Sequence, residues 1–238
     1  MVEKFFLALD YEKPDDIVAK GLGAIDFLEN KYSKSFVEKR VGVKINEDML
    51  TGKIDERFKD FKDKRGCSIF ADKKISHGSD TGRRIMERLL GQLPTEYVTV
   101  SANMGLKVLS EYVQYGNELG LKVIGWTVHT KTPPEDAERI YRQSLGDSIY
   151  TLVQIASEAK CDAAVMEASM LKDERIIKLP IKHLVTGIRI DTSDKGTQQR
   201  ISSLEDVANI KPLVDYAVIS SRYLSDFESL EEIISTLK

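Results

Sequence analysis

The sequence predicts an α/β fold, a closed (β/α)8 barrel of the TIM type, and three observations lead to this class. Short apolar runs rich in β-branched residues alternate with amphipathic segments, as strands and helices do in α/β proteins. There are eight such runs, and the chain of 238 residues has the usual length of this barrel. Both facts favour the barrel over a doubly wound sheet. No linker or low-complexity segment interrupts the alternation, so we expect one domain over residues 1–238.

The apolar runs are predicted to be strands. Their near-continuous hydrophobicity is typical of parallel strands that are covered on both faces. The predicted strands are Phe5–Asp10, Val41–Asn46, Cys67–Asp72, Tyr97–Ser101, Val123–His129, Ala163–Glu167, His183–Ile188 and Tyr216–Ser220.

The amphipathic segments between them are predicted to be helices. They are Asp15–Asn30, Asp80–Gly91, Gly105–Gly120, Pro134–Ala159, Ser203–Ile210 and Phe227–Leu237. Pro134 suits a first helical turn, and Gly120 lies where a helix would end. The charged segment 55–65 indicates a solvated helical face, with Phe58 and Phe61 pointing inward at a spacing of three.

The composition is that of an ordinary soluble globular protein. Hydrophobic residues make up 42% of the chain and charged residues 31%, and the net charge of −3 argues against nucleic acid as the main partner. The chain begins directly with a strand-like run and has no apolar stretch of about 18 residues, so we expect neither a signal peptide nor a membrane span. Cys67 and Cys161 lie in separate apolar runs, which predicts buried, reduced thiols and a cytoplasmic protein.

Ionisable side chains gather at the carboxyl ends of the predicted strands. The first strand ends in Asp10, the second carries Lys44, the third ends in Asp72 and is followed by Lys74, and the seventh runs into Arg189. Barrels of this class hold their chemistry at that end of the strands. We therefore expect the active site there.

The pair Asp72 and Lys74 is the sharpest chemical signal. The strand period of two directs both side chains to the same face, and a carboxylate beside an ammonium supports both charged forms. Such a lysine is able to protonate a carbanion. The alternative is an ordinary surface ion pair. The presence of Asp10 and Lys44 at two neighbouring strand ends favours a functional role.

These residues belong to a set of motifs spread over most of the chain. The motifs are Leu7-Ala8-Leu9-Asp10, Val43-Lys44, Asp72-x-Lys74 with Thr81, Val98-Thr99-Val100, and Thr186-Gly187-Ile188-Arg189 continuing to Gln198-Gln199-Arg200-Ile201. In their order and strand placement the chain resembles the orotidine 5′-phosphate decarboxylases, which make UMP from OMP. The spacing of nine residues from Arg189 to Gln198 resembles the phosphate-gripping loop of that family.

The resemblance implies a role for each reactive residue. Asp10 and Lys44 would bind the ribose hydroxyls, with Lys44 part of the catalytic charge network. Asp72 would lie against the substrate carboxylate, and Lys74 would protonate the ring carbon after CO2 leaves. No metal or cofactor is implied, because the charged network itself stabilises the developing carbanion.

The resemblance also implies how the rest of the substrate is held. Arg189 and Gln198 would bind the phosphate, helped by backbone amides of the last two loops. Thr81 would reach the ribose across the interface of a homodimer with a shared active site. The implied partner is a small phosphorylated molecule, with neither nucleic acid nor a membrane involved.

Three positions depart from the family pattern. The second aspartate of the motif Asp-x-Lys-x-x-Asp is His77 here, which is able to hydrogen-bond a hydroxyl but supplies no negative charge. The serine that reads the pyrimidine aligns with Lys131, next to Thr130, and the arginine after the eighth strand aligns with Ser221, next to Arg222. We keep His77 as a candidate catalytic residue and Thr130 and Arg222 as candidate substrate-binding residues.

Two alternatives to OMP decarboxylation follow from these departures. A magnesium-dependent branch of the superfamily acts on hexulose and ketogulonate phosphates, but places a metal-binding glutamate on the second strand where this chain has Lys44. A non-catalytic, nucleotide-binding paralogue would accommodate the departures but not the retention of Asp72 and Lys74. His129, His183 and Trp126 are interpreted as structural residues, and scattered histidines disfavour a zinc site.

Overall fold

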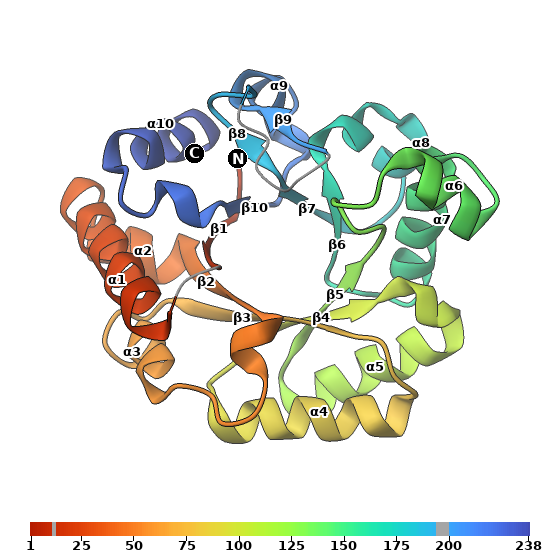
Figure 1. Cartoon of the computed structure of the whole chain (residues 1–238), viewed down its shortest axis with the longest axis horizontal. Helices are drawn as coiled ribbons and strands as arrows, with labels where there is room; N and C mark the ends of the chain where they lie inside the picture. The colour runs from red at the N-terminus through yellow and green to blue at the C-terminus, as the bar shows by residue number, and fades with distance from the viewer. Residues whose placement is uncertain (11–12, 194–199) are drawn as a thin grey trace.

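The computed structural model describes residues 1–10, 13–193 and 200–238, and its centre is a closed barrel of parallel strands (Figure 1). The barrel strands are β1 (Lys4–Leu9), β2 (Val41–Asn46), β3 (Ser68–Ile75), β4 (Tyr97–Ser101), β5 (Lys122–Trp126), β6 (Ala163–Glu167), β7 (Lys182–Thr186) and β10 (Tyr216–Ile219). Their order around the barrel is β1-β10-β7-β6-β5-β4-β3-β2. The predicted fold class is confirmed.

Helices surround the barrel on its outside (Figure 1). They are α1 (Pro14–Lys31), α2 (Lys34–Arg40), α3 (Asp60–Asp63), α4 (Ser79–Gln92), α5 (Gly105–Leu119), α6 (Pro134–Tyr141), α7 (Leu145–Glu158), α8 (Glu174–Ile177), α9 (Leu204–Asn209) and α10 (Phe227–Leu237). None of the helices among the described residues has the length and hydropathy needed to cross a membrane.

The prediction of one long helix over Pro134–Ala159 is wrong. Arg142 takes a left-handed conformation with φ of 59° and ends α6, and its N–H donates to the carbonyl of Glu138. Ser144 then caps α7, because its hydroxyl accepts a hydrogen bond from the N–H of Asp147. The break puts two shorter helices where periodicity alone indicated one.

Two predicted strands extend two or three residues too far. The strand predicted over Val123–His129 ends at Trp126, so the residues after it leave the barrel. The strand predicted over His183–Ile188 ends at Thr186, because Gly187 has a φ of 80°, a conformation that favours glycine. Beyond this turn a short strand, β8 (Ile188–Arg189), pairs in parallel with β9 (Ser202–Ser203).

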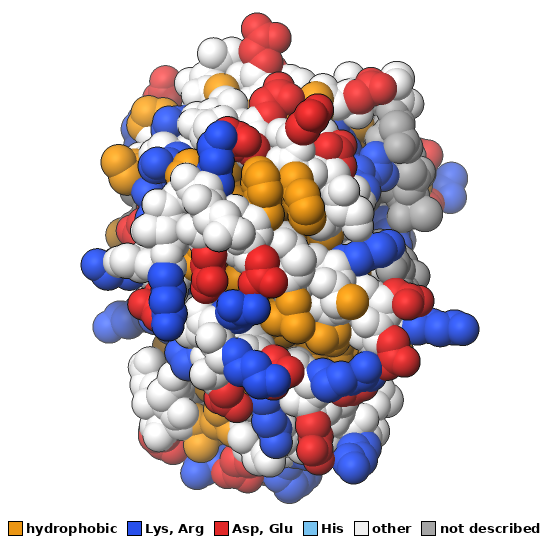
Figure 2. Space-filling view, turned by 90° about the vertical axis from the view of Figure 1, so that its left-hand side faces the viewer, with side chains coloured by type: hydrophobic (Ala, Val, Ile, Leu, Met, Phe, Trp, Pro, Cys, Tyr) orange, Lys and Arg blue, Asp and Glu red, His pale blue; other side chains and the backbone are white. Residues whose placement is uncertain are grey.

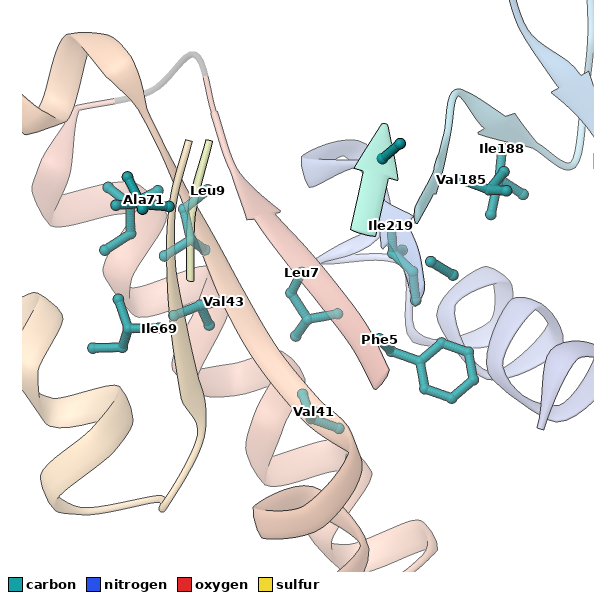
Figure 3. Close-up of a cluster of buried hydrophobic side chains, with 14 of the residues drawn as sticks. Phe5, Leu7, Leu9, Val41, Val43, Ile69, Ala71, Val185, Ile188 and Ile219 are labelled. Carbon is teal, nitrogen blue, oxygen red and sulfur yellow. The ribbon is translucent and has the colours of Figure 1, made fainter. Parts of the chain in front are cut away.

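The core has two layers, separated by the alternation of side chains along the strands. Phe5, Leu7 and Leu9 of β1 point outward to the helices (Figure 3), and Phe58 and Phe61 are buried in the same layer, as predicted. The alternate residues fill the inside of the barrel, where Phe6 lies 5.0 Å from Phe70 and 5.1 Å from Tyr97, measured between ring centroids. The same alternation directs Lys44 of β2 into the barrel.

Both cysteines are buried and free, as predicted. Burial raises the pKa of the Cys67 and Cys161 thiols to about 12. On the side of the molecule shown in Figure 2, Lys and Arg side chains are interspersed with Asp and Glu, and small apolar groups lie between them. That side therefore lacks the single-sign stripe of a phosphate-tracking surface.

Candidate active site

A cavity of about 960 Å³ opens at the carboxyl ends of the strands. Seven of the residues proposed from the sequence line it, and these are Asp10, Lys44, Asp72, Lys74, Thr130, Arg189 and Arg222. They come from segments far apart in the chain, which the closed barrel brings to one mouth.

Two aspartates and two lysines that line the cavity form one connected array. Lys44 Nζ lies 3.0 Å from Asp10 Oδ1 and 3.2 Å from Asp72 Oδ2, and Lys74 Nζ lies 2.8 Å from the same Asp72 oxygen. The charges alternate along it in the order Asp10, Lys44, Asp72, Lys74. The four side chains are largely shielded from solvent, with exposed fractions between 10% and 18%.

The array keeps its central members charged at neutral pH. Burial by itself would raise the pKa of Asp72, but the Lys44 and Lys74 ammonium groups and the hydrogen bonds from Lys74 and Thr99 lower it to about 2. Burial likewise opposes the charge of Lys44, and the carboxylates of Asp72 and Asp10 reverse this effect and raise its pKa. A ligand that enters the cavity therefore meets fixed charges of both signs.

The meeting of Asp72 and Lys74 depends on an irregular strand. The sequence predicted a regular strand ending at Asp72, whereas β3 continues to Ile75 and its register against β4 shifts between Ala71 and Ile75. Lys74 lies in the left-handed region with φ of 50°. The two side chains do share one face, as expected, but a bulge rather than simple alternation sets their contact.

Two arginines from the last part of the barrel face the same cavity. Arg189 of β8 is buried, and its Nη1 donates to the carbonyl of Ile188 at 2.8 Å. Arg222 lies with Ser221 in a 3-10 helix, Ser221–Tyr223, that follows β10. Thr130 and Lys131 line the cavity from the segment after β5. Gln198, the predicted partner of Arg189, lies outside the described residues.

His77 and Thr81 are not among the cavity-lining residues of the part of the chain described here. His77 is exposed before α4, and its carbonyl accepts a hydrogen bond from Tyr112 Oη at 2.8 Å. Thr81 lies in the first turn of α4, where its hydroxyl accepts a hydrogen bond from Arg84 Nη2 at 3.1 Å. Within one chain, then, neither residue reaches the array.

Two residues interpreted as structural, Trp126 and His129, also line the cavity. His129 Nδ1 accepts a hydrogen bond from the N–H of Lys131 at 3.1 Å, so in the neutral ring Nε2 carries the proton. Burial and the ammonium groups of Lys74 and Lys131 lower the pKa of His129, which keeps the ring neutral at pH 7. The position of His129 just after a strand was the one feature of the sequence that could have indicated its place in the cavity. His183 is structural, as predicted, with Nδ1 bonded to the carbonyl of Leu213 at 2.9 Å.

A buried ion pair behind the cavity was not foreseen. Arg200 Nε lies 3.2 Å from Glu167 Oε1, and the exposed fractions of the two side chains are 10% and 5%. Arg200 Nη2 also donates to the carbonyls of Val128 and His129, at 3.1 and 3.2 Å. One guanidinium thus joins the end of β6 to the segment that follows β5.

The described residues include no cluster of three or more His, Cys, Asp or Glu side chains arranged to hold a metal ion. The two carboxylates of the array, Asp10 and Asp72, have the Lys44 ammonium between them.

Comparison with known proteins adds a family and a fold. The family model described as "Orotidine 5'-phosphate decarboxylase / HUMPS family" matches residues 3–222. The chain is 27% identical over 177 residues to an orotidine 5′-phosphate decarboxylase of Malacoplasma penetrans, an alignment that covers 71% of this chain and 74% of that protein.

Solved structures of the same fold cover nearly the whole chain. Orotidine 5′-monophosphate decarboxylase of Methanocaldococcus jannaschii, complexed with the inhibitor BMP, superposes with a TM-score of 0.72 at 18% identity and covers 100% of both chains. Orotidine 5′-phosphate decarboxylase of Pyrococcus horikoshii OT3 gives a TM-score of 0.69 at 18% identity over 98% of both chains. At these identities the likeness concerns the fold.

Proposed function

The chain belongs to the orotidine 5′-phosphate decarboxylase / HUMPS family, and on that premise we propose that it is a carboxy-lyase that converts OMP to UMP without a metal or an organic cofactor. The observation that carries the proposal is the alternating array Asp10–Lys44–Asp72–Lys74 in a cavity that Arg189 also lines. This array has the charges that the reaction requires, in a site of the right size for a nucleotide.

The reaction needs an electron pair to stay on a ring carbon and then to accept a proton. As the bond between the ring carbon and the carboxylate breaks, CO2 leaves and the pair stays behind. The Asp72 carboxylate disfavours the neighbouring substrate carboxylate, whereas the Lys74 ammonium stabilises the developing carbanion. Lys74 then gives its proton to the carbon, forming the C–H bond of UMP, and regains one from water.

The remaining groups hold the nucleotide in place for this step. Asp10 and Lys44 are proposed to bind the ribose hydroxyls, and Arg189, with Gln198, the phosphate. Thr130 and Arg222 line the same cavity and are the candidates for contacts to the base and the phosphate. A phosphorylated ligand for this chain is also consistent with the structure of the M. jannaschii relative, which was solved with the inhibitor BMP.

A sugar-phosphate reaction that depends on magnesium is the less favoured function. Lys44 Nζ lies within 3.2 Å of a carboxylate oxygen of each of Asp10 and Asp72, and a fixed ammonium there competes with a divalent cation for the same two ligands. A decarboxylase that works through charged side chains uses this arrangement directly.

We further propose that the enzyme is a cytoplasmic homodimer in which the segment 77–81 of each subunit enters the other's site. The exposed side chain of His77, and the fact that neither His77 nor Thr81 lines the cavity of its own chain, support a role in trans. Light scattering at micromolar concentration should give twice the mass of one chain. A monomer at that concentration would contradict the shared site.

The proposed activity is tested by following the loss of OMP absorbance, with the Lys74→Ala variant as the control for contaminating enzyme. Turnover by the wild type that the variant lacks supports the proposal. An inactive wild type that fails to bind UMP would overturn it and would direct attention to other phosphorylated ligands.

A further inference from the structure

The bulge in β3 lies opposite a single residue of β4. Ala71 pairs with Val98 and Ile75 pairs with Val100, so that residues 72–74 face Thr99 alone. The bulge places Lys74 in the left-handed region, with φ of 50°, which a residue with a side chain adopts only when its surroundings hold it there. Whatever satisfies the backbone at this point also fixes the geometry of the array.

The Thr99 hydroxyl fills the gap that the bulge leaves. Its Oγ1 accepts a hydrogen bond from the N–H of Lys74 at 2.8 Å and donates one to Asp72 Oδ1 at 3.0 Å. The direction of both bonds is fixed, because an ionised carboxylate only accepts, an amide only donates, and a hydroxyl has a single hydrogen. Thr99 is 1% exposed, so water does not replace either bond at the protein surface.

These bonds divide the two oxygens of Asp72 between different partners. Oδ1 is taken by Thr99, and Oδ2 is shared by the ammonium groups of Lys44 and Lys74. Rotation of the carboxylate would break the bond to Thr99 and would move the oxygen that both lysines contact. One hydroxyl therefore controls both the orientation of Asp72 and the backbone of Lys74.

We propose that Thr99 is a positioning residue, which holds Asp72 and Lys74 in their reactive arrangement through these two hydrogen bonds. Its kinetic consequence rests on the function proposed above, whereas its geometric consequence does not. Simple packing would favour an apolar residue here, because Tyr97, two residues earlier on the same face, lies among the apolar side chains inside the barrel.

Two substitutions at this position separate hydrogen bonding from packing. Thr99→Val keeps the shape and removes both bonds, and loss of a hydrogen bond to a charged group predicts a fall in kcat of about tenfold to hundredfold. The dissociation constant for UMP should change by less than about threefold, because Thr99 bonds to Asp72 and Lys74 and not to the residues proposed to hold the ribose and the phosphate. Thr99→Ser, which restores the hydroxyl, should recover most of the rate.

The pH profile gives a readout that a purely structural role would not move. The hydrogen bond from Thr99 helps to lower the pKa of Asp72, so Thr99→Val should raise that pKa and shift the acid limb of kcat to higher pH. Thr127→Val is the matched control, since Thr127 is equally buried and its hydroxyl donates to the carbonyl of Val165 at 2.7 Å, outside the array. This control should lower the melting temperature without shifting the profile.

A crystal structure of Thr99→Val makes the test independent of turnover. The expected result is that Lys74 leaves the left-handed region or that its Nζ moves away from Asp72 Oδ2. An unmoved Lys74 and Asp72 would overturn the positioning role, as would a wild-type rate and pH profile in an active enzyme. If the wild type does not act on OMP, the proposed function fails, and the crystal structure still decides the role of Thr99.

Discussion

The two ends of the barrel both carry networks of charged and polar side chains, but the two networks differ in exposure and in surroundings: the side chains of Lys62 and Glu96 at the amino end are 40% and 35% exposed, whereas those of the array are 10% to 18% exposed. At the amino ends of the strands, Ser68 Oγ donates to Glu96 Oε2 at 2.9 Å. Lys4 Nζ donates to Ser68 Oγ, and Lys62 Nζ donates to Glu96 Oε1. Tyr216 Oη donates to Asp162 Oδ2 at 2.8 Å in a second group at this end. The carboxyl ends carry the array of Asp10, Lys44, Asp72 and Lys74.

The two networks differ in what lies beside them inside the barrel. Four aromatic rings fill the barrel beside the network at the amino ends of the strands. They belong to Phe6, Phe70, Tyr97 and Tyr216, and the centroids of neighbouring rings are 5.0 to 6.2 Å apart. The array at the carboxyl ends lies beside the cavity of about 960 Å³. A network of charged side chains thus forms a candidate active site only where a ligand has room to reach it, and at the other end the charged groups lie against a filled barrel interior.

The largest expected effect contrasts one lysine from each end. Lys74→Ala should lower kcat for OMP by at least about 10³-fold, because the proton donor and its positive charge are lost together. Lys4→Ala should leave kcat within about twofold. Steady-state assays of the two purified variants check this. Equal losses of kcat in both variants would contradict the claim that only the network at the carboxyl ends takes part in catalysis.

A smaller gain is expected from restoring the carboxylate that the motif lacks. His77→Asp should increase kcat by roughly 10²-fold if the segment of the partner subunit reaches Lys74, since one well-placed charge in a dry site has an effect of this size. The measurement is kcat of the variant against the wild type at pH 7. An unchanged rate would mean that another carboxylate already serves, with Asp80 the first to test.

Loss of the phosphate contact should affect binding more than chemistry. Arg189→Ala is expected to raise KM by about tenfold to hundredfold, the usual effect of removing a charge-assisted hydrogen bond. A fall in kcat as well would indicate that phosphate binding energy is used to close the site. Arg175→Ala, at an exposed ion pair with Asp147, is the control, and a KM that does not change in Arg189→Ala would exclude this phosphate site.

The acid stability of the array gives the smallest effect. The folded-state pKa of Asp72, about 2, lies below that of an unfolded aspartate, about 3.9, so its contribution to stability is present above about pH 4 and is lost as the pH falls toward 2. Urea unfolding of the wild type and Asp72→Asn should therefore show a difference in free energy that narrows between pH 6 and pH 3. A constant difference would contradict the lowered pKa.

Much of the barrel could be predicted because its signals are local. The strands Val41–Asn46, Tyr97–Ser101 and Ala163–Glu167 have the predicted bounds, since clear apolar runs define them. The break between α6 and α7 could not be predicted, because Arg142 adopts a left-handed conformation without the glycine that usually indicates one.

The residues of the candidate site likewise fall into those that the sequence could predict and those that it could not. Asp10, Lys44 and Asp72 could be placed from the sequence, since ionisable side chains at the ends of apolar strands have few other reasons to be there. Thr99 and Arg200 stand within the motifs found in the sequence, but their contacts with Asp72, Lys74 and Glu167 could not be predicted, because these depend on a bulge and on distant segments coming together. A buried threonine in a strand has the same sequence signature whether it packs or positions a neighbour.

The central claim is that the charged mouth of this barrel binds a pyrimidine nucleotide and stabilises negative charge at its ring carbon. Calorimetric titration with UMP and with its 6-hydroxy analogue, whose anionic oxygen is bonded to the ring carbon where the carbanion forms, tests this most directly. We predict one site per subunit and affinity for the analogue at least about 10²-fold tighter than for UMP, as expected of a mimic of the transition state. Equal affinity for both ligands, or binding of sugar phosphates but of neither nucleotide, would contradict the account.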